Sequence, residues 1–329
     1  MTSVALPTAP GRPLWRTAQY VGVILTLALI GALWMVPKPA LKLLWDMVIP
    51  LLPAVFLVNP LIWRNVCPLA TLNDLSGDRS DRPAASSALV HAGWIVGIAL
   101  LFVLVPARRF LFNENGPALA VTVTLVAVLA VATGFAFARR AGFCSSICPV
   151  LPVEKLYGQA PLLAMHGARC DRCTLCTPIG CIDLAATKTV AQTIGPLRRD
   201  TSWLRTGFGA FAAAFPGFVI GYFTTTNGDL ASAGAVYLRV LGFAIASYAI
   251  VAAATTAFRM RAALAMPLLG AIALGLYYWY ATPALALAYG APEVTTLVLR
   301  VVIGATLAFW LWKALPRTQY GRNGVAAAT

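Results

Sequence analysis

Residues Pro117–Ala138 have the sequence PALAVTVTLVAVLAVATGFAFA, a run of 22 residues without a charged side chain. An α-helix rises about 1.5 Å per residue, so this run is long enough to cross the roughly 30 Å hydrocarbon core of a bilayer. The whole chain has the same character, since 60% of its 329 residues are hydrophobic and only 11% are charged. Soluble domains carry about 25% charged residues. So few charges cannot cover a soluble protein of this size, and the sequence therefore predicts an all-α polytopic membrane protein.

Seven further apolar runs have the length of a membrane span, which predicts about eight transmembrane helices. They are Gln19–Val36, Leu41–Val58, Ala88–Val105, Thr206–Thr225, Ala235–Ala257, Ala262–Ala281 and Glu293–Trp312. The second run contains Lys42, Asp46 and two prolines, which favour a kinked, re-entrant or half-buried segment. The run that begins at Ala262 has room to continue past Pro283 as a broken helix.

The basic residues predict how these spans are oriented. With a cytoplasmic N-terminus, 19 of the 25 Lys and Arg residues fall in cytoplasmic segments, and the opposite loops hold chiefly Lys38, Lys42, Arg108 and Arg109. Positive charge is concentrated in the cytoplasmic loops of membrane proteins. We therefore expect a multi-pass protein of the bacterial inner membrane with both termini in the cytoplasm. The net charge of +14 then reflects topology, with the lipid bilayer rather than a nucleic acid as the partner.

The seven cysteines are clustered in the chain. Cys67 follows the second run, and the other six lie between the fourth and fifth runs, at Cys144, Cys148, Cys170, Cys173, Cys176 and Cys181. By the expected topology all seven lie at the cytoplasmic face, where thiols stay reduced. Their density therefore indicates a metal site rather than a disulfide framework.

Residues 170–176, CDRCTLC, have C-x2-C-x2-C spacing, and Cys181 follows after four more residues. This spacing is typical of bacterial ferredoxins, in which a tight loop points three thiolates at one [4Fe–4S] cluster. Two clusters held by cysteine alone need eight thiolates, and the chain has seven. We therefore expect one [4Fe–4S] cluster, held by Cys170, Cys173, Cys176 and Cys181. Two alternatives are a structural zinc site and a cluster whose fourth ligand is Cys148.

Two Cys-Pro corners precede this loop. Residues 139–149, RRAGFCSSICP, contain C-x3-C-P, and residues 59–69, NPLIWRNVCPL, are a degenerate copy with Trp63 in place of the first cysteine. Each copy follows a membrane run, so two helix pairs are expected to present matching corners to the cytoplasm. Cys67, Cys144 and Cys148 would then form a second, incomplete three-thiolate site, a redox pair or an unmetallated corner.

This arrangement resembles the ferredoxin-type membrane proteins of periplasmic nitrate reductase and nitrous oxide reductase systems, the NapH- and NosR-like family. The resemblance rests on Cys144–Pro149 and Cys170–Cys176 and covers about residues 63–183. It implies a four-helix membrane core followed by cytoplasmic iron–sulfur clusters, and a role in electron transfer or in maturation of partner metalloenzymes. The chain departs from the family in having one ferredoxin run rather than two and four further apolar runs after it.

These patterns divide the chain into membrane helices 1–4 (residues 1–138, with the degenerate corner at 63–69), a cytoplasmic ferredoxin-like iron–sulfur loop (139–204) and membrane helices 5–8 (205–329). They favour a membrane-integral electron-transfer protein that passes electrons between a cytoplasmic or quinone donor and a membrane or periplasmic redox partner protein. No acid–base or nucleophilic group accompanies the cysteines, so no independent substrate turnover is expected. One alternative is an assembly, maturation or regulatory factor that senses or delivers metal, and another is a transporter.

Overall fold

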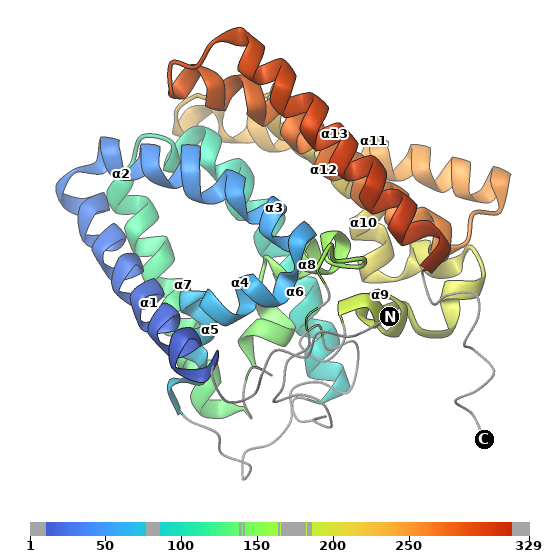
Figure 1. The fold of residues 1–329 in the computed structure, drawn as a ribbon, viewed down its shortest axis with the longest axis horizontal. Coiled ribbons are helices and arrows are strands. Elements are labelled where there is room, and N and C mark those ends of the chain that lie inside the picture. Colours follow the sequence, from blue (N-terminus) through green and yellow to red (C-terminus); the bar gives the residue numbers. More distant parts are fainter. Residues whose placement is uncertain are drawn as a thin grey trace. The chain divides into compact units, whose positions relative to one another are not determined.

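The computed structural model describes residues 11–76, 86–137, 140, 142–163, 165, 182 and 186–317 (Figure 1). All regular secondary structure in these residues is helical. Eight helical segments are long and apolar enough to cross a membrane: Leu14–Met35, Pro37–Val58, Ser87–Phe112, Gly116–Ala136, Gly207–Thr224, Leu230–Phe258, Ala262–Ala288 and Glu293–Leu315. The described residues therefore confirm the predicted all-helical fold with eight candidate membrane-spanning helices. The loop with Cys170, Cys173, Cys176 and Cys181 lies outside the described residues.

The observed spans coincide with the predicted runs and differ mainly where prolines occur. The second span joins α2 (Pro37–Leu43), a π-helical turn (Leu44–Val48) and α3 (Ile49–Val58), and is long enough to cross the membrane completely. The third span extends beyond its predicted end because the helix continues through Pro106, and the seventh continues past Pro283, as the sequence left open. A proline keeps its φ in the helical range and removes one hydrogen bond, so a membrane helix can contain it.

The chain divides into two compact units. Unit 1 comprises residues 1–104 and 111–189, and unit 2 comprises residues 105–110 and 190–329. The helices of unit 1 are α1 (Gly11–Met35), α2, α3, α4 (Pro60–Val66), α5 (Pro68–Asn73), most of α6 (Ser87–Ala107), α7 (Gly116–Ala136) and α8 (Leu151–Tyr157). Those of unit 2 are α10 (Gly207–Thr224), α11 (Ala233–Phe258), α12 (Ala262–Ala288) and α13 (Glu293–Arg317), and α9 (Ala186–Ile194) lies across the boundary. The three-part division at residues 138 and 204 stays a prediction.

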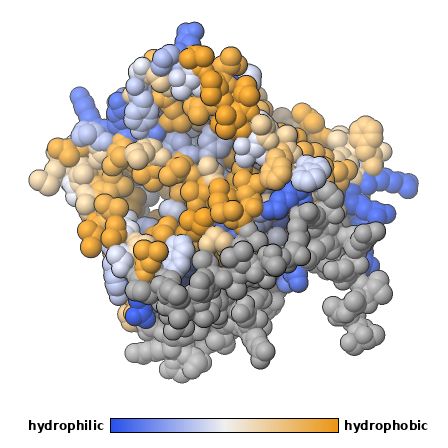
Figure 2. Space-filling model, in the orientation of Figure 1, coloured by the Kyte–Doolittle hydropathy of each residue, from blue (hydrophilic) through white to orange (hydrophobic). Residues whose placement is uncertain are grey.

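Large apolar side chains are exposed on the spans of both units. On α1, Leu25 is 64% exposed, and on α13, Leu297 is 63% exposed. Figure 2 shows hydrophobic residues over much of the visible face of the described helices. Contiguous apolar surface of this kind is rare on soluble monomers, so the exposed faces of the spans fit contact with lipid.

In unit 2, α10 is the most buried span. Its aromatic side chains Phe211, Phe215 and Phe218 form a continuous row, with ring centroids 4.8 and 5.8 Å apart. Gly217 lets α10 approach α11 closely, because a Cβ at this position would lie 2.1 Å from the carbonyl oxygen of Phe243. The core of this unit therefore lies between α10 and its neighbours.

Candidate functional site

The two Cys-Pro corners of unit 1 have the same local conformation. Cys67 has φ −59° and ψ 122°, and Cys148 has φ −57° and ψ 120°. A following proline disfavours helical ψ in the residue before it, which interrupts the helical path at both cysteines. The chain then turns into helix again, as the carbonyl of Cys67 accepts a hydrogen bond from Thr71 N at 3.0 Å and that of Cys148 from Leu151 N at 3.2 Å. The degenerate repeat in the sequence thus corresponds to two matching corners.

A buried ion pair joins the corners. Arg64 lies in α4, just before the first corner, and Glu154 lies in α8, just after the second. Arg64 Nη1 donates a hydrogen bond to Glu154 Oε2 at 3.1 Å, and the two side chains are only 4% and 3% exposed. The same nitrogen lies 3.5 Å from the carbonyl oxygen of Cys144. Charges removed from water need such partners, so the pair ties two segments together that are 90 residues apart in the chain.

Further cations surround the corners. Lys155 is buried, and its Nζ lies 4.1 Å from the ring centroid of Trp94 in α6, a cation–π contact. Arg140 Nε donates a hydrogen bond to Asp74 Oδ2 at 3.0 Å. Together with the Arg64–Glu154 pair, these residues place three cations and two carboxylates around the corners. This excess of one positive charge would stabilise a negatively charged group near the corners.

The three described cysteines share one environment. Cys144 belongs to a buried cluster with Ala70, Ala130 and Phe143, and both Cys67 and Cys148 pack against this cluster. The thiol of Cys144 also lies 4.0 Å from Asn73 Oδ1. The amide of Asn73 is fixed in turn, because its Nδ2 donates to the carbonyl oxygen of Ala130 in α7 at 2.6 Å. Packing and polar contacts thus hold both corners against the same span.

Burial determines the protonation of these thiols. It raises the pKa of Cys67 and of Cys148 to about 12, because the thiolate would be removed from water. It raises the pKa of Cys144 even further, although Arg64 and Arg140 act in the opposite direction. Burial therefore favours the neutral thiol form of all three side chains as long as no metal is bound.

In the described part of the chain, no group of three or more His, Cys, Asp or Glu side chains is placed to hold a metal ion. Cys67, Cys144 and Cys148 share one environment but form no such group. The three interpretations of these cysteines therefore stay predictions.

The two Cys-Pro corners pack against the membrane spans of unit 1. Gly22 of α1 faces the carbonyl oxygen of Val66, which a Cβ would approach to 2.8 Å, and Gly97 of α6 faces that of Cys148, at 3.1 Å. The 21 residues of α7 cover about 32 Å, close to the thickness of the hydrocarbon core. Ala130, which belongs to the same buried cluster as Cys144, lies six residues, or about 9 Å, inside the end of this helix. The corners therefore pack beside α7 about 9 Å inside the end of this helix, rather than beyond it.

The segment that enters the cysteine-rich loop is attached beside the first corner. Leu163 N donates to the carbonyl oxygen of Val58 at 3.0 Å, and Asn59 Nδ2 donates to the carbonyl oxygen of Leu163 at 2.9 Å. Asn59 also caps α4 by accepting a hydrogen bond from Leu61 N. On the far side of the loop, Ile182 is only 2% exposed. Both flanks of the loop thus pack as parts of unit 1, whereas the four ligands expected there lie outside the described residues.

The sequence alone assigns no role to Arg64, Asn73, Glu154 and Lys155. A signal was present, because an arginine occurs in both copies of the Cys-Pro motif and Glu154 follows the second copy closely. No family model, curated protein or solved structure matches the chain. The function therefore has to be inferred from the residues themselves.

Proposed function

We propose that this protein is a membrane-integral iron–sulfur electron-transfer protein of the bacterial inner membrane. A [4Fe–4S] cluster, bound by Cys170, Cys173, Cys176 and Cys181, would supply a one-electron couple on the cytoplasmic side. Electrons would pass between a cytoplasmic or quinone donor and a membrane or periplasmic redox partner, with no atoms transferred. This role extends the family resemblance of residues 63–183.

The observation that carries the proposal is the attachment of the cysteine-rich loop. Through Asn59 and Leu163, the chain enters this loop from the segment that forms the first Cys-Pro corner. The corners in turn reach about 9 Å into the layer of the spans at Ala130. A redox group held by the loop would therefore lie beside a packed, water-poor path toward the membrane interior.

The charges at the corners support the same role. A cubane cluster with four thiolates is anionic and gains one further negative charge on reduction. The excess of buried cations, Arg64 and Lys155 against Glu154, would stabilise that charge and raise the reduction potential. The protein's own contribution is thus to fix thiolates, exclude water and supply positive potential.

The ion pairs between the corners support a location of both Cys-Pro corners on one side of the membrane. The connection after the second span contributes Arg64 and Asp74, and the connection after the fourth contributes Arg140 and Glu154. Their two ion pairs require both connections to lie on the same side of the membrane. The distribution of basic residues favours the cytoplasm as that side.

The decisive experiment is iron and acid-labile sulfide analysis, with EPR spectroscopy, on protein purified without oxygen. We expect about four irons per chain and a signal that appears on reduction. Cys173→Ser should abolish both, since it removes one of three thiolates in the same tight loop. Cys67→Ser is the matched control and should retain the iron, because Cys67 is not among the four proposed ligands. Stoichiometric zinc without sulfide would refute the proposal, and equal iron loss in both variants would refute the ligand assignment.

A further inference from the structure

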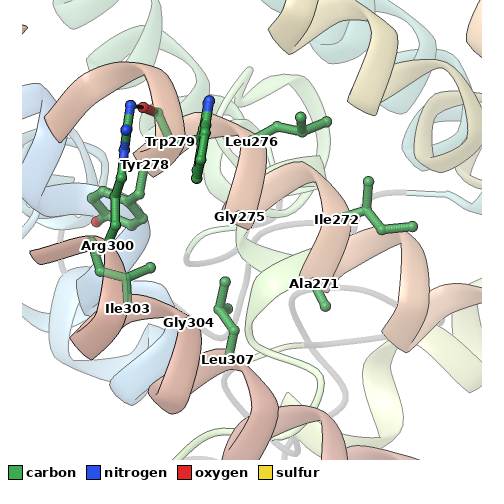
Figure 3. Close-up of a pocket in the computed structure, with 10 residues that line it drawn as sticks. All are labelled: Ala271, Ile272, Gly275, Leu276, Tyr278, Trp279, Arg300, Ile303, Gly304 and Leu307. Carbon is green, nitrogen blue, oxygen red and sulfur yellow. Dashed lines mark hydrogen bonds between the residues drawn. The ribbon is translucent and has the colours of Figure 1, made fainter. Parts of the chain in front are cut away.

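A groove runs between α12 and α13 in unit 2 (Figure 3). Its volume is about 440 Å³, within the range of about 300–1,000 Å³ that small-molecule sites occupy. Apolar side chains such as Leu276, Ile303 and Leu307 line it, and Gly275 and Gly304 widen it from opposite helices. A Cβ at Gly304 would meet no atom within 4 Å. This glycine therefore contributes open space rather than a close helix contact.

Arg300 lies at one end of the groove, beside Trp279 (Figure 3). Its guanidinium carbon is 3.9 Å from the ring centroid of Trp279, and its Nη2 donates to the carbonyl oxygen of the same residue at 2.8 Å. This carbonyl cannot receive the usual helical hydrogen bond from four residues ahead, because Pro283 has no N–H. Arg300 supplies the missing donor and is thereby held at the mouth of the groove.

The remaining donors of Arg300 are not all used. Its Nε is buried and has no hydrogen-bond partner, and no carboxylate of the described residues is in ion-pair range of the guanidinium. Arg300 lies seven residues after Glu293, so it is about 10 Å along α13 from the start of the span. A charged side chain at such a position is costly without an acceptor and usually indicates a functional site.

We propose that this groove binds one membrane phospholipid, with its phosphate at Arg300 and an acyl chain along the surface between Gly275 and Gly304. Guanidinium groups bind phosphate oxygens through charge-assisted hydrogen bonds, and a phosphate here would supply the negative charge that no described carboxylate provides to Arg300. The apolar walls match an acyl chain, and the depth of Arg300 suits a headgroup near the end of the span. Charge complementarity favours a phospholipid over an uncharged lipid. The proposal concerns unit 2 alone and does not rest on electron transfer.

Two variants remove the two halves of the site. Arg300→Gln removes the charge but retains an amide that can donate to the carbonyl of Trp279. Gly304→Leu fills the groove with a side chain at a position where a Cβ has free space. The matched control is Gly242→Leu in α11, where a Cβ also meets nothing within 4 Å and which does not line the groove. Because Gly304→Leu leaves Arg300 intact, a folding defect of Arg300→Gln would still leave the proposal testable.

Delipidated full-length protein in detergent is titrated with phosphatidylglycerol and with diacylglycerol of the same chains, and adducts are counted by native mass spectrometry. We expect one retained phosphatidylglycerol, binding at least tenfold more weakly in Arg300→Gln and Gly304→Leu and unchanged in Gly242→Leu. A phosphatidylglycerol with a photoreactive acyl chain should label peptides of α12 and α13. Equal retention of diacylglycerol, unchanged binding in both groove variants, or a copurified quinone in the groove would overturn the proposal.

Discussion

Arg64 and Glu154 form the ion pair that holds the two Cys-Pro corners of unit 1 together, with 3.1 Å between Nη1 and Oε2 and almost no exposure to solvent. The partners come from different connections between spans, so their pairing fixes how these connections fold against each other. This buried pair, together with the Arg140–Asp74 pair, thus joins the two copies of the internal repeat.

Removing one partner of this pair should be strongly destabilising. Arg64→Met leaves the Glu154 carboxylate buried without its cation, and breaking a buried pair in this way costs about 3–5 kcal/mol. The double variant Arg64→Met/Glu154→Leu removes both charges and should recover most of that loss. Thermal unfolding of purified protein in detergent measures both effects.

Arg140→Gln provides the control for this prediction. It breaks the pair with Asp74, whose side chain is 38% exposed, and partly exposed pairs contribute about 0–1 kcal/mol. We therefore expect a small shift in unfolding temperature. Equal losses for Arg64→Met and Arg140→Gln would show that the buried pair has no special role.

Gly134→Ala should destabilise the contact between α5 and α7. A Cβ at this position would lie 2.1 Å from the carbonyl oxygen of Asn73, so the corner has to move. The matched control is Gly31→Ala in α1, where a Cβ meets nothing within 4 Å. Alanine is the better helix former by about 1 kcal/mol, so the control should be neutral or stabilising. Unfolding temperatures should change in opposite directions, and a stabilised Gly134→Ala would contradict the observed packing.

The buried thiols predict a loss of stability at alkaline pH. In the unfolded chain a cysteine has a pKa of about 8.5. Burial raises the pKa of Cys67 and of Cys148 to about 12 in the folded protein. Below about pH 8 both states keep the proton, so these thiols make no pH-dependent difference. Between about pH 9 and 12 the unfolded chain releases protons that the folded chain retains. The free energy of unfolding therefore falls by up to about 1.4 kcal/mol per thiol for each pH unit.

Unfolding temperatures between about pH 8 and 11 test this dependence. The variant Cys67→Ala/Cys148→Ala should lose less stability over this range than the parent protein, because two of the linked protons are gone. Other groups that titrate at high pH affect both proteins equally. Parallel pH profiles would mean that water reaches these thiols in the folded state.

Reporter fusions can determine the orientation of the spans. A periplasm-active phosphatase joined after Asn227, between the fifth and sixth spans, should be active. The same fusion after Thr201, which follows the cysteine-rich loop, should be inactive because that region is expected in the cytoplasm. The reversed result would overturn both the orientation and the argument that the cysteines stay reduced.

The spans could be predicted from sequence because hydropathy over about twenty residues reports directly on contact with lipid. Continuation past Pro283 was left open by the sequence, whereas extension through Pro106 depends on neighbouring packing, which a local pattern does not contain. The packing of the corners against the spans depends on close approaches at Gly22 and Gly97. It also depends on the Arg64–Glu154 ion pair, whose partners are 90 residues apart in the chain. The glycines were visible in the sequence, but their partners were not. The ligand set Cys170, Cys173, Cys176 and Cys181 stays a prediction.

The last prediction distinguishes an electron-transfer protein from one that delivers metal to a partner enzyme. Cys144→Ser/Cys148→Ser replaces one buried and one half-buried thiol by hydroxyls of similar shape. The hydroxyl introduced at position 144 would lie where the thiol of Cys144 now approaches Asn73 Oδ1 at 4.0 Å. The fold and the iron content should therefore be retained. Sulfur can be oxidised and reduced reversibly, whereas a serine oxygen cannot. If electrons pass through the corner, reoxidation of the reduced protein in vesicles should be at least tenfold slower than in Cys67→Ser. Normal reoxidation together with loss of metal from a co-expressed partner would instead identify the protein as an assembly factor.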